Sequence, residues 1–159
     1  MYQARKVIDQ LTDNMEQKIC VNCYLISVLV VLDQITKLIF SPRDFFIGLI
    51  HIHLVRNFGL GFSFNFGLPA NLIIIATALI FFIYYYFSHR KDLSWTGKIM
   101  VVLILAGAIS NIIDRLYLGY VRDFLDLGLG FTFNLADVMI IIGLIMIIFS
   151  QKYEANLGD

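Results

Sequence analysis

Hydrophobic residues gather into four long runs along the chain, and polar stretches separate the runs. The second run contains no charged residue, whereas each of the others has polar residues near one end. A helix needs about 20 apolar residues, within a range of about 17–25, to cross a bilayer. The third and fourth runs reach that length only with their polar ends included, so we expect those ends to lie at membrane depth or at the interface. The four runs are residues 19–38, 69–87, 99–113 and 135–150.

Composition supports a membrane protein. Hydrophobic residues make up 59% of the 159 residues and charged residues 15%, whereas soluble domains average about 45–50% and about 25%. The net charge is zero, so the chain lacks the basic surface that a nucleic-acid partner requires. We therefore predict an all-α membrane protein with four transmembrane helices. It would form a single membrane-embedded domain over residues 1–159, with residues 1–18 as a cytoplasmic extension.

Lysine and arginine residues indicate the orientation. Four crossings put both termini on one side, and cytoplasmic loops carry more Lys and Arg than outer loops. With both termini in the cytoplasm, seven of the 12 Lys and Arg residues lie on that side. The asymmetry grows if Lys37, Arg56 and Arg115 belong to a functional site. We expect cytoplasmic termini and place the connections 40–68 and 114–134 on the outer face.

The first outer connection contains a strand pattern. In the stretch LIHIHLVRN, Ile50, Ile52 and Leu54 alternate with His51 and His53, and a period of two is typical of a half-exposed strand. A segment rich in Gly and Phe follows. We therefore predict a small β-structure on the outer face, lying on the membrane.

Two groups of residues have the chemistry of metal ligands. Cys20 and Cys23 form a C-x-x-C pair, but the chain has no second cysteine pair to complete a zinc site. His51 and His53 share one face of the predicted strand, with no third ligand nearby in the sequence. We interpret both groups as structural and predict neither a metal ion nor a cofactor.

The third apolar run carries a polar face. Gly107, Asn111, Asp114 and Arg115 follow helical spacing, so they fall on one side of a helix. Ionisable groups in a membrane segment are energetically costly and usually functional. The alternative is a structural network that holds the helices together, with Arg115 paired to a carboxylate.

The fourth run begins with residues that favour a helix start. Asn134 is a good N-cap residue, and Asp137 would then occupy the third helical position, where acidic groups are common because the helix N-terminus is partially positive. This placement alone would explain Asp137 without any catalytic role.

Four carboxylates are expected at the same outer edge, and their number favours a catalytic role. They belong to Asp114, Asp123, Asp126 and Asp137. Two carboxylates brought close in a low-dielectric site cannot both ionise easily, so one keeps its proton. Such a pair can act as base and acid at once and hydrolyse a peptide bond with an activated water. The residues alone leave open which of Asp114, Asp123 or Asp126 would partner Asp137. The chain has neither G-x-S-x-G nor H-E-x-x-H, which disfavours a serine or zinc protease.

Two other classes stay open. A small transporter or channel subunit could use the carboxylates in an ion path, although an ion path would place them at several depths. A catalytically inactive membrane protein could use the same carboxylates to bind a peptide without cutting it. A flux measurement would identify the first class and an activity measurement the second.

Five motifs, in one consistent order, resemble the bacterial lipoprotein signal peptidases, also called type II signal peptidases. The resemblance extends from about residue 32 to residue 142. The motifs DQITK, RNFGLGFSF, GAISNIIDR, GYVRDF and FNLAD are similar to the family patterns D-x-x-[TS]-K, N-x-G-x-x-F-S, G-G-x-x-G-N-x-x-D-R, G-x-V-x-D-F and F-N-x-A-D.

The resemblance implies roles for individual residues. Asp123 and Asp137 match the catalytic aspartates of the family, whereas Asp114 matches a structural one. Asp33 and Lys37 match a supporting pair. The residues that match site-lining, substrate-positioning members of the family are Asn57, Asn111, Arg115 and Asn134.

The resemblance also implies a fold, a substrate and a place. The family fold has four transmembrane helices and a small β-cradle on the outer face. The substrate would be a prolipoprotein cut just before its diacylglyceryl-modified Cys, in the bacterial inner membrane, with the active site near the outer face and membrane lipid around it. Two features depart from the family: Ala108 and Ser110 replace glycines, and the link from Asp123 to Asp137 is short, which puts substrate breadth and gating in doubt.

Overall fold

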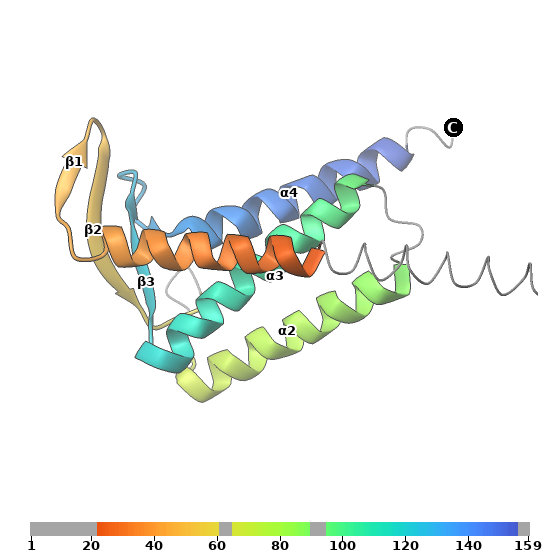
Figure 1. Ribbon diagram of the computed structural model, residues 1–159, viewed down its shortest axis with the longest axis horizontal. Coiled ribbons are helices and arrows are strands. Elements are labelled where there is room, and N and C mark those ends of the chain that lie inside the picture. The colour runs from red at the N-terminus through yellow and green to blue at the C-terminus, as the bar shows by residue number, and fades with distance from the viewer. Residues whose placement is uncertain (1–21, 61–64, 90–94, 156–159) are drawn as a thin grey trace, which may run out of the picture.

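The protein is a bundle of four helices with a small antiparallel sheet at one end (Figure 1). This computed structural model describes residues 22–60, 65–89 and 95–155. The predicted extension 1–18, and Cys20 with it, lie outside the described residues. The described helices are the first helix (Asn22–Phe40), α2 (Leu68–His89), α3 (Trp95–Leu118) and α4 (Leu135–Ala155).

Three of the four helices are long and apolar enough to cross a membrane. The first helix, α2 and α3 have mean hydropathies of 1.8, 2.0 and 2.0. The apolar part of α4, Leu135–Phe149, is shorter than these, and its first turn carries Asp137. The predicted mostly helical fold is therefore confirmed, with three helices long and apolar enough to cross a membrane, while four crossings stay a prediction.

The sheet follows the order β1-β2-β3-β4 and is antiparallel throughout. It joins a hairpin from the connection 40–68 to a hairpin from the connection 114–134. The strand predicted around His51 and His53 is confirmed as β2. Its alternation is broken at Leu54, which is exposed, because the register shifts between Ile52 and Val55. The strands are β1, Phe45–Ile47, β2, Ile50–Asn57, β3, Val121–Asp126, and β4, Thr132–Phe133.

A glycine turn directs the chain from α3 into the sheet. The Gly119 amide donates to the carbonyl of Arg115 at 3.0 Å, and Gly119 has a φ of 83°. A residue in this left-handed conformation commonly ends a helix, and glycine adopts it without a steric penalty. Strand β3 begins two residues later, at Val121. The turn therefore brings Asp123 back over the end of the bundle.

Helix α3 is the centre of the bundle and packs closely against α4. A Cβ atom added at Gly107 would collide with the carbonyl oxygen of Ala136 and with Ile140. Ala106, Ala136 and Met139 form the buried apolar cluster at this contact. The close approach sets the height at which the first turn of α4 meets α3, and this height places the polar residues described below.

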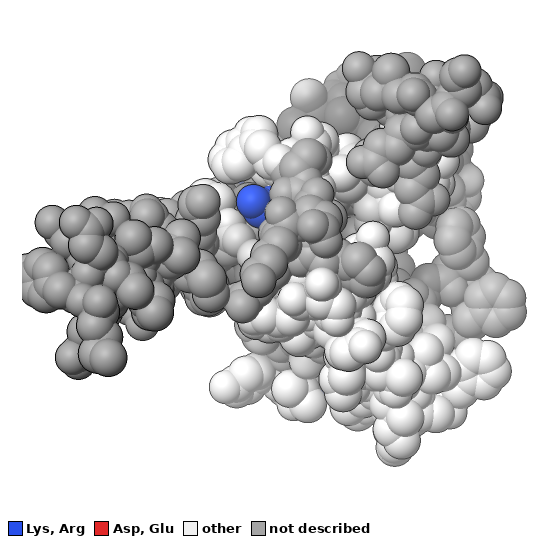
Figure 2. Space-filling model, turned by 90° about the vertical axis from the view of Figure 1, so that its right-hand side faces the viewer, with Lys and Arg blue, Asp and Glu red and all other residues white. Residues whose placement is uncertain are grey.

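The two ends of the bundle differ in chemistry. The first helix ends, α2 begins, α3 ends and α4 begins at the end that carries the sheet (Figure 1). Figure 2 shows the opposite end, where the described surface is uncharged apart from a small basic area. A groove at that opposite end is lined mainly by apolar side chains, among them Leu25, Leu29, Trp95 and Val102. The predicted site residues all lie toward the other end.

Candidate active site

Buried polar side chains are concentrated where the helices meet the sheet. Burying a charge or an amide away from water is costly unless it is paired or hydrogen-bonded. The network described here satisfies nearly all of them with protein partners. The buried members of this group are Asp33, Lys37, Ser110, Asn111, Asp114, Arg115, Asp123 and Asn134.

The first helix contributes an ion pair that joins three helices. Lys37 Nζ lies 2.8 Å from Asp33 Oδ2, one helical turn away. Ser110 Oγ on α3 donates to the same oxygen at 2.6 Å, and the backbone N–H of Ala136 on α4 donates to Asp33 Oδ1 at 2.8 Å. The predicted supporting role of Asp33 and Lys37 agrees with this geometry.

Asp114 anchors strand β3, and both of its carboxylate oxygens have hydrogen-bond partners. Its carboxylate accepts from the backbone N–H of Arg122 at 3.0 Å and forms an ion pair with the Arg122 guanidinium at 2.7 Å. Gln34 donates to it at 3.1 Å, and Lys37 lies 3.5 Å away. Arg122 and Gln34 were not singled out from the sequence, because their partner lies on another element.

The contacts of Arg115 differ from those expected if it only held the helices together. That alternative paired Arg115 with a carboxylate, but among the described residues its hydrogen bonds go to carbonyl oxygens, those of Gly59 and Asn111. The carboxylate next to it in sequence, Asp114, is taken by Arg122. The Nε atom of Arg115 is buried and has no partner within the described part of the chain, so one donor of this guanidinium is left over.

Asp123 reaches the bundle from β3 and is held by two amides. In the register of the sheet it lies opposite Val55, so Asn57, two residues further along β2, shares its face. Asn57 Nδ2 donates to Asp123 Oδ2 at 2.9 Å, and Asn134 Nδ2 donates to Asp123 Oδ1 at 2.6 Å. Both carboxylate oxygens therefore have a donor.

Asp137 starts α4 as the sequence predicted. The backbone N–H of Asp137 donates to Asn134 Oδ1 at 3.0 Å, and the backbone N–H of Asn134 donates to Asp137 Oδ2 at 3.2 Å. This reciprocal pair is a capping box. The other oxygen, Oδ1, accepts from Asn111 Nδ2 at 2.8 Å. The capping role is confirmed, and it leaves the carboxylate beside the polar face of α3.

Asn111 and Asn134 connect the two aspartates through a single network. Lys37 Nζ donates to Asn111 Oδ1 at 2.9 Å, so the amide nitrogen of Asn111 turns toward Asp137. Asn134 Nδ2 donates both to Asn111 Oδ1, at 3.3 Å, and to Asp123. The structure thus brings together Asp123 and Asp137.

The environment of Asp123 favours its protonated form. Burial, together with the negative charge of Asp137, raises the pKa of Asp123 to about 7, while the hydrogen bonds from Asn57 and Asn134 act in the opposite direction. A carboxyl group with such a pKa holds or releases a proton near neutral pH. Next to a second carboxyl group it can supply the acid of an acid–base pair without a metal ion.

Asp126 lies on the other face of the same strand. It is three residues from Asp123, and side chains alternate along a strand. The sequence left open which aspartate partners Asp137; the geometry favours Asp123, because Asp114 is paired with Arg122 and the Asp126 carboxylate contacts His53 at 3.4 Å. Asp126 is the last residue of β3.

Comparisons with known proteins agree on one family. Residues 25–152 match the family model described as signal peptidase (SPase) II. A lipoprotein signal peptidase of Buchnera aphidicola is 31% identical over 86% of this chain and 93% of its own length. One of Caldicellulosiruptor bescii is 37% identical over 75% and 82%. Two solved structures of bacterial membrane enzymes superpose with TM-scores of 0.76 and 0.72, at 28% and 30% identity, covering 89% and 84% of this chain and 93% of each of theirs.

Proposed function

The chain belongs to the signal peptidase II family, and from this premise we propose that it is an aspartic endopeptidase of the bacterial inner membrane. It cleaves the signal peptide from diacylglyceryl-modified prolipoproteins just before the lipidated Cys. The observation that carries the proposal is the buried amide network that holds Asp123 and Asp137 together. The relatives named above are lipoprotein signal peptidases, which supports the substrate class.

Asp123 and Asp137 share one proton in the resting enzyme. In this proposal Asp123 holds that proton and Asp137 is the base; the rise in the pKa of Asp123, caused by burial and by the negative charge of Asp137, supports this assignment. Asp137 takes a proton from a water molecule whose oxygen attacks the scissile carbonyl carbon, and Asp123 donates its proton to the oxygen of that carbonyl. As the tetrahedral intermediate collapses, one of its two hydroxyl groups returns a proton to Asp123 and re-forms the carbonyl, while the C–N bond breaks and the proton on Asp137 goes to the leaving amine, so the pair again shares one proton.

The neighbouring side chains position these two groups and the substrate. Asn111 and Asn134 fix the orientation of both carboxyl groups, and Lys37 fixes Asn111. Among the described residues the buried Nε–H of Arg115 has no partner, which supports a role as a donor to a substrate carbonyl. Asn57 both contacts Asp123 and, through its Oδ1, accepts from the Gly59 amide at 2.9 Å. This second bond holds the chain at the exit of β2 next to the site.

The membrane arrangement follows from the bundle. We take helix α4 as the fourth crossing; its packing along α3, and its end on the same side as the start of the first helix (Figure 1), support this arrangement. With cytoplasmic termini, the sheet and the two aspartates lie at the outer face. The substrate, anchored there by its lipid, meets water and the carboxyl pair at the membrane surface. Exposed side chains of the sheet region, such as Phe46, Ile47 and Leu49, would face the lipid.

The proposal is tested by processing of a model prolipoprotein in cells depleted of their own lipoprotein signal peptidase. The parent chain should convert the lipidated precursor to the mature form on a gel, whereas Asp123→Asn and Asp137→Asn should not. Asp92→Asn, between the end of α2 and the start of α3 in the sequence, is the matched control and should process it. Equal processing by either catalytic variant would refute the mechanism. Equal processing of a reporter whose lipobox Cys is replaced by Ser would refute the substrate class.

A further inference from the structure

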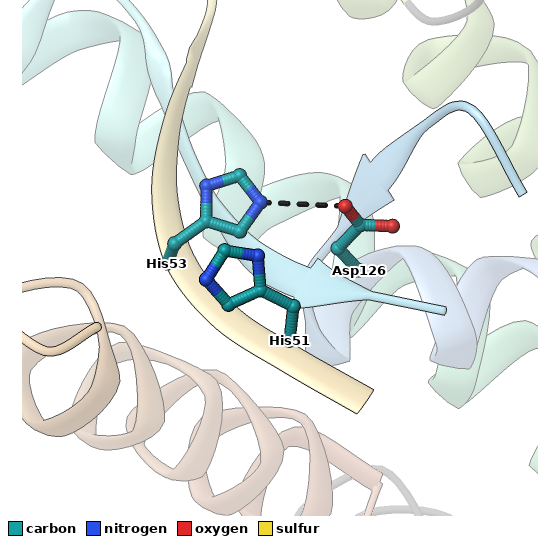
Figure 3. A group of neighbouring side chains, drawn as sticks. All are labelled: His51, His53 and Asp126. Atoms are coloured by element: carbon teal, nitrogen blue, oxygen red, sulfur yellow. Dashed lines mark hydrogen bonds and ion pairs between the residues drawn. The ribbon is translucent and has the colours of Figure 1, made fainter. Parts of the chain in front are cut away.

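Two histidines and an aspartate meet on the outer sheet, away from the aspartate pair. His51 lies directly opposite Asp126 in the β2–β3 register, and His53 is two residues further along β2. Opposed residues and residues two apart share a face of a sheet, so all three side chains project on one side. Figure 3 shows the His53 ring and the Asp126 carboxylate turned toward each other, with His51 next to them. One ligand atom from each lies within 4.8 Å of the other two.

One pair of these atoms already has a spacing close to that of two ligands around a metal ion. In a tetrahedral zinc site with bonds of about 2.0–2.1 Å, two ligand atoms are separated by about 3.3 Å. The nitrogen Nε2 of His53 and Oδ2 of Asp126 are already 3.4 Å apart. His51 has further to move, because its ring is stacked on that of His53 with centroids 4.2 Å apart. It must turn out of this stack, since an ion lies in the plane of each ring that binds it.

Two other groups orient the ligands from outside. Asp44 Oδ1 lies 2.8 Å from His51 Nε2, which leaves Nδ1 of that ring as the nitrogen for an ion. The Gly128 amide donates to Asp126 Oδ1 at 2.7 Å, which leaves Oδ2. Histidine ligands of metals usually donate their other N–H to a carboxylate or a carbonyl, which fixes the tautomer and the ring orientation. The cluster therefore has outer partners as well as ligands.

We propose that His51, His53 and Asp126 form a binding site for a divalent zinc ion on the outer sheet. Two imidazoles and one carboxylate are a common zinc ligand set, and three protein ligands leave a fourth position for water. All three side chains are only about a quarter exposed, at 27%, 26% and 28%, so water gives little competition on their inner side.

The ion would tie β2 to β3 beyond the register shift. The ladder is interrupted between Ile52 and Val55, so the sheet is least constrained there. Asp123 lies on the same strand as Asp126, three residues earlier and on the other face. Bound zinc would therefore stiffen the strand that carries a member of the aspartate pair without contacting it. This site is independent of the proposed peptidase chemistry.

Zinc titration of the purified, full-length protein in detergent tests the site, with the affinity tag free of histidine. The parent should bind one Zn²⁺, seen by calorimetry, and one Co²⁺ with the visible absorption of a tetrahedral site. His53→Ala and Asp126→Ala should weaken binding by more than about 100-fold. Asp44→Asn should weaken it by about 10–100-fold, the effect typical of an outer partner. His89→Ala, at the end of α2, should bind as the parent does.

Three results would overturn the site. They are the absence of a one-to-one complex, binding by His53→Ala equal to that of the parent, and loss of binding in His89→Ala. The zinc-dependent rise of the unfolding temperature provides a second readout, which should disappear in His53→Ala. Circular dichroism confirms that each variant is folded before titration. No substrate is present in these measurements, so their result stands whether or not the peptidase proposal holds.

Discussion

Replacing Asn57 with alanine should shift the pH range of activity upward. Asn57 donates to Asp123 Oδ2 at 2.9 Å and stabilises the ionised form of that carboxyl group. If Asp123 must be protonated to act as the acid, activity falls as the pH rises through its pKa of about 7. Removing the donor disfavours ionisation, so the pKa rises and the enzyme stays active to a higher pH.

The hydrogen bond sets the size of the shift. A hydrogen bond to a charged group contributes about 1.5–3 kcal/mol, and one to a neutral group about 1 kcal/mol. The difference is about 0.5–2 kcal/mol, and about 1.36 kcal/mol corresponds to one pKa unit. The basic limb of kcat/KM should therefore move from about 7 to about 8 in Asn57→Ala. This limb reports the pair of aspartates as a unit.

The assay is cleavage of a lipidated prolipoprotein peptide by the purified enzyme across the pH range. Asn65→Ala is the matched control, since Asn65 Oδ1 accepts from the Gly67 amide at 2.9 Å. Asn57 makes the same turn contact with Gly59, but no contact between Asn65 and Asp123 is present. A basic limb that stays within about 0.3 units of the parent in Asn57→Ala, or an equal shift in Asn65→Ala, would refute the reasoning.

Three further predictions concern stability, each measured by thermal unfolding in detergent. Lys37→Met should destabilise the protein by about 3–5 kcal/mol, because the buried Asp33 carboxylate loses its counter-ion. Combining Lys37→Met with Asp33→Asn should recover part of the lost stability, and no recovery would contradict the pairing. Gly107→Val should cost about 1–3 kcal/mol or more, because any Cβ there meets the Ala136 carbonyl; an unchanged unfolding temperature would exclude this close contact. The pKa of Asp123, about 7, is above that of an unfolded aspartate, so the folded state binds more protons than the unfolded state. This contribution to stability is lost as the pH rises through about 7. The loss of stability between about pH 6 and about pH 8 should therefore be smaller in Asp123→Asn than in the parent, and an equal loss would show that another group titrates.

The local features of the chain were predictable because they depend on neighbours in sequence. Apolar runs identified the helices, since the run length needed to cross a bilayer is a local property. The capping box of Asn134 and Asp137 and the strand around His51 follow from short-range patterns in the same way. The polar face of α3 followed from helical spacing, and the family from the order of five motifs.

Tertiary structure decided which polar groups meet, because their partners are separated by long stretches of chain. Asp114 and Asp123 look equivalent in sequence, but the turn at Gly119 and the β2–β3 register place one against Arg122 and the other beside Asn134. Likewise, the sequence showed two histidines without a third ligand, and strand pairing brought Asp126 to them from 73 residues away. Sequence periodicity assigns a side chain to a face of its own element, whereas the partner on that face is set by how the elements pack.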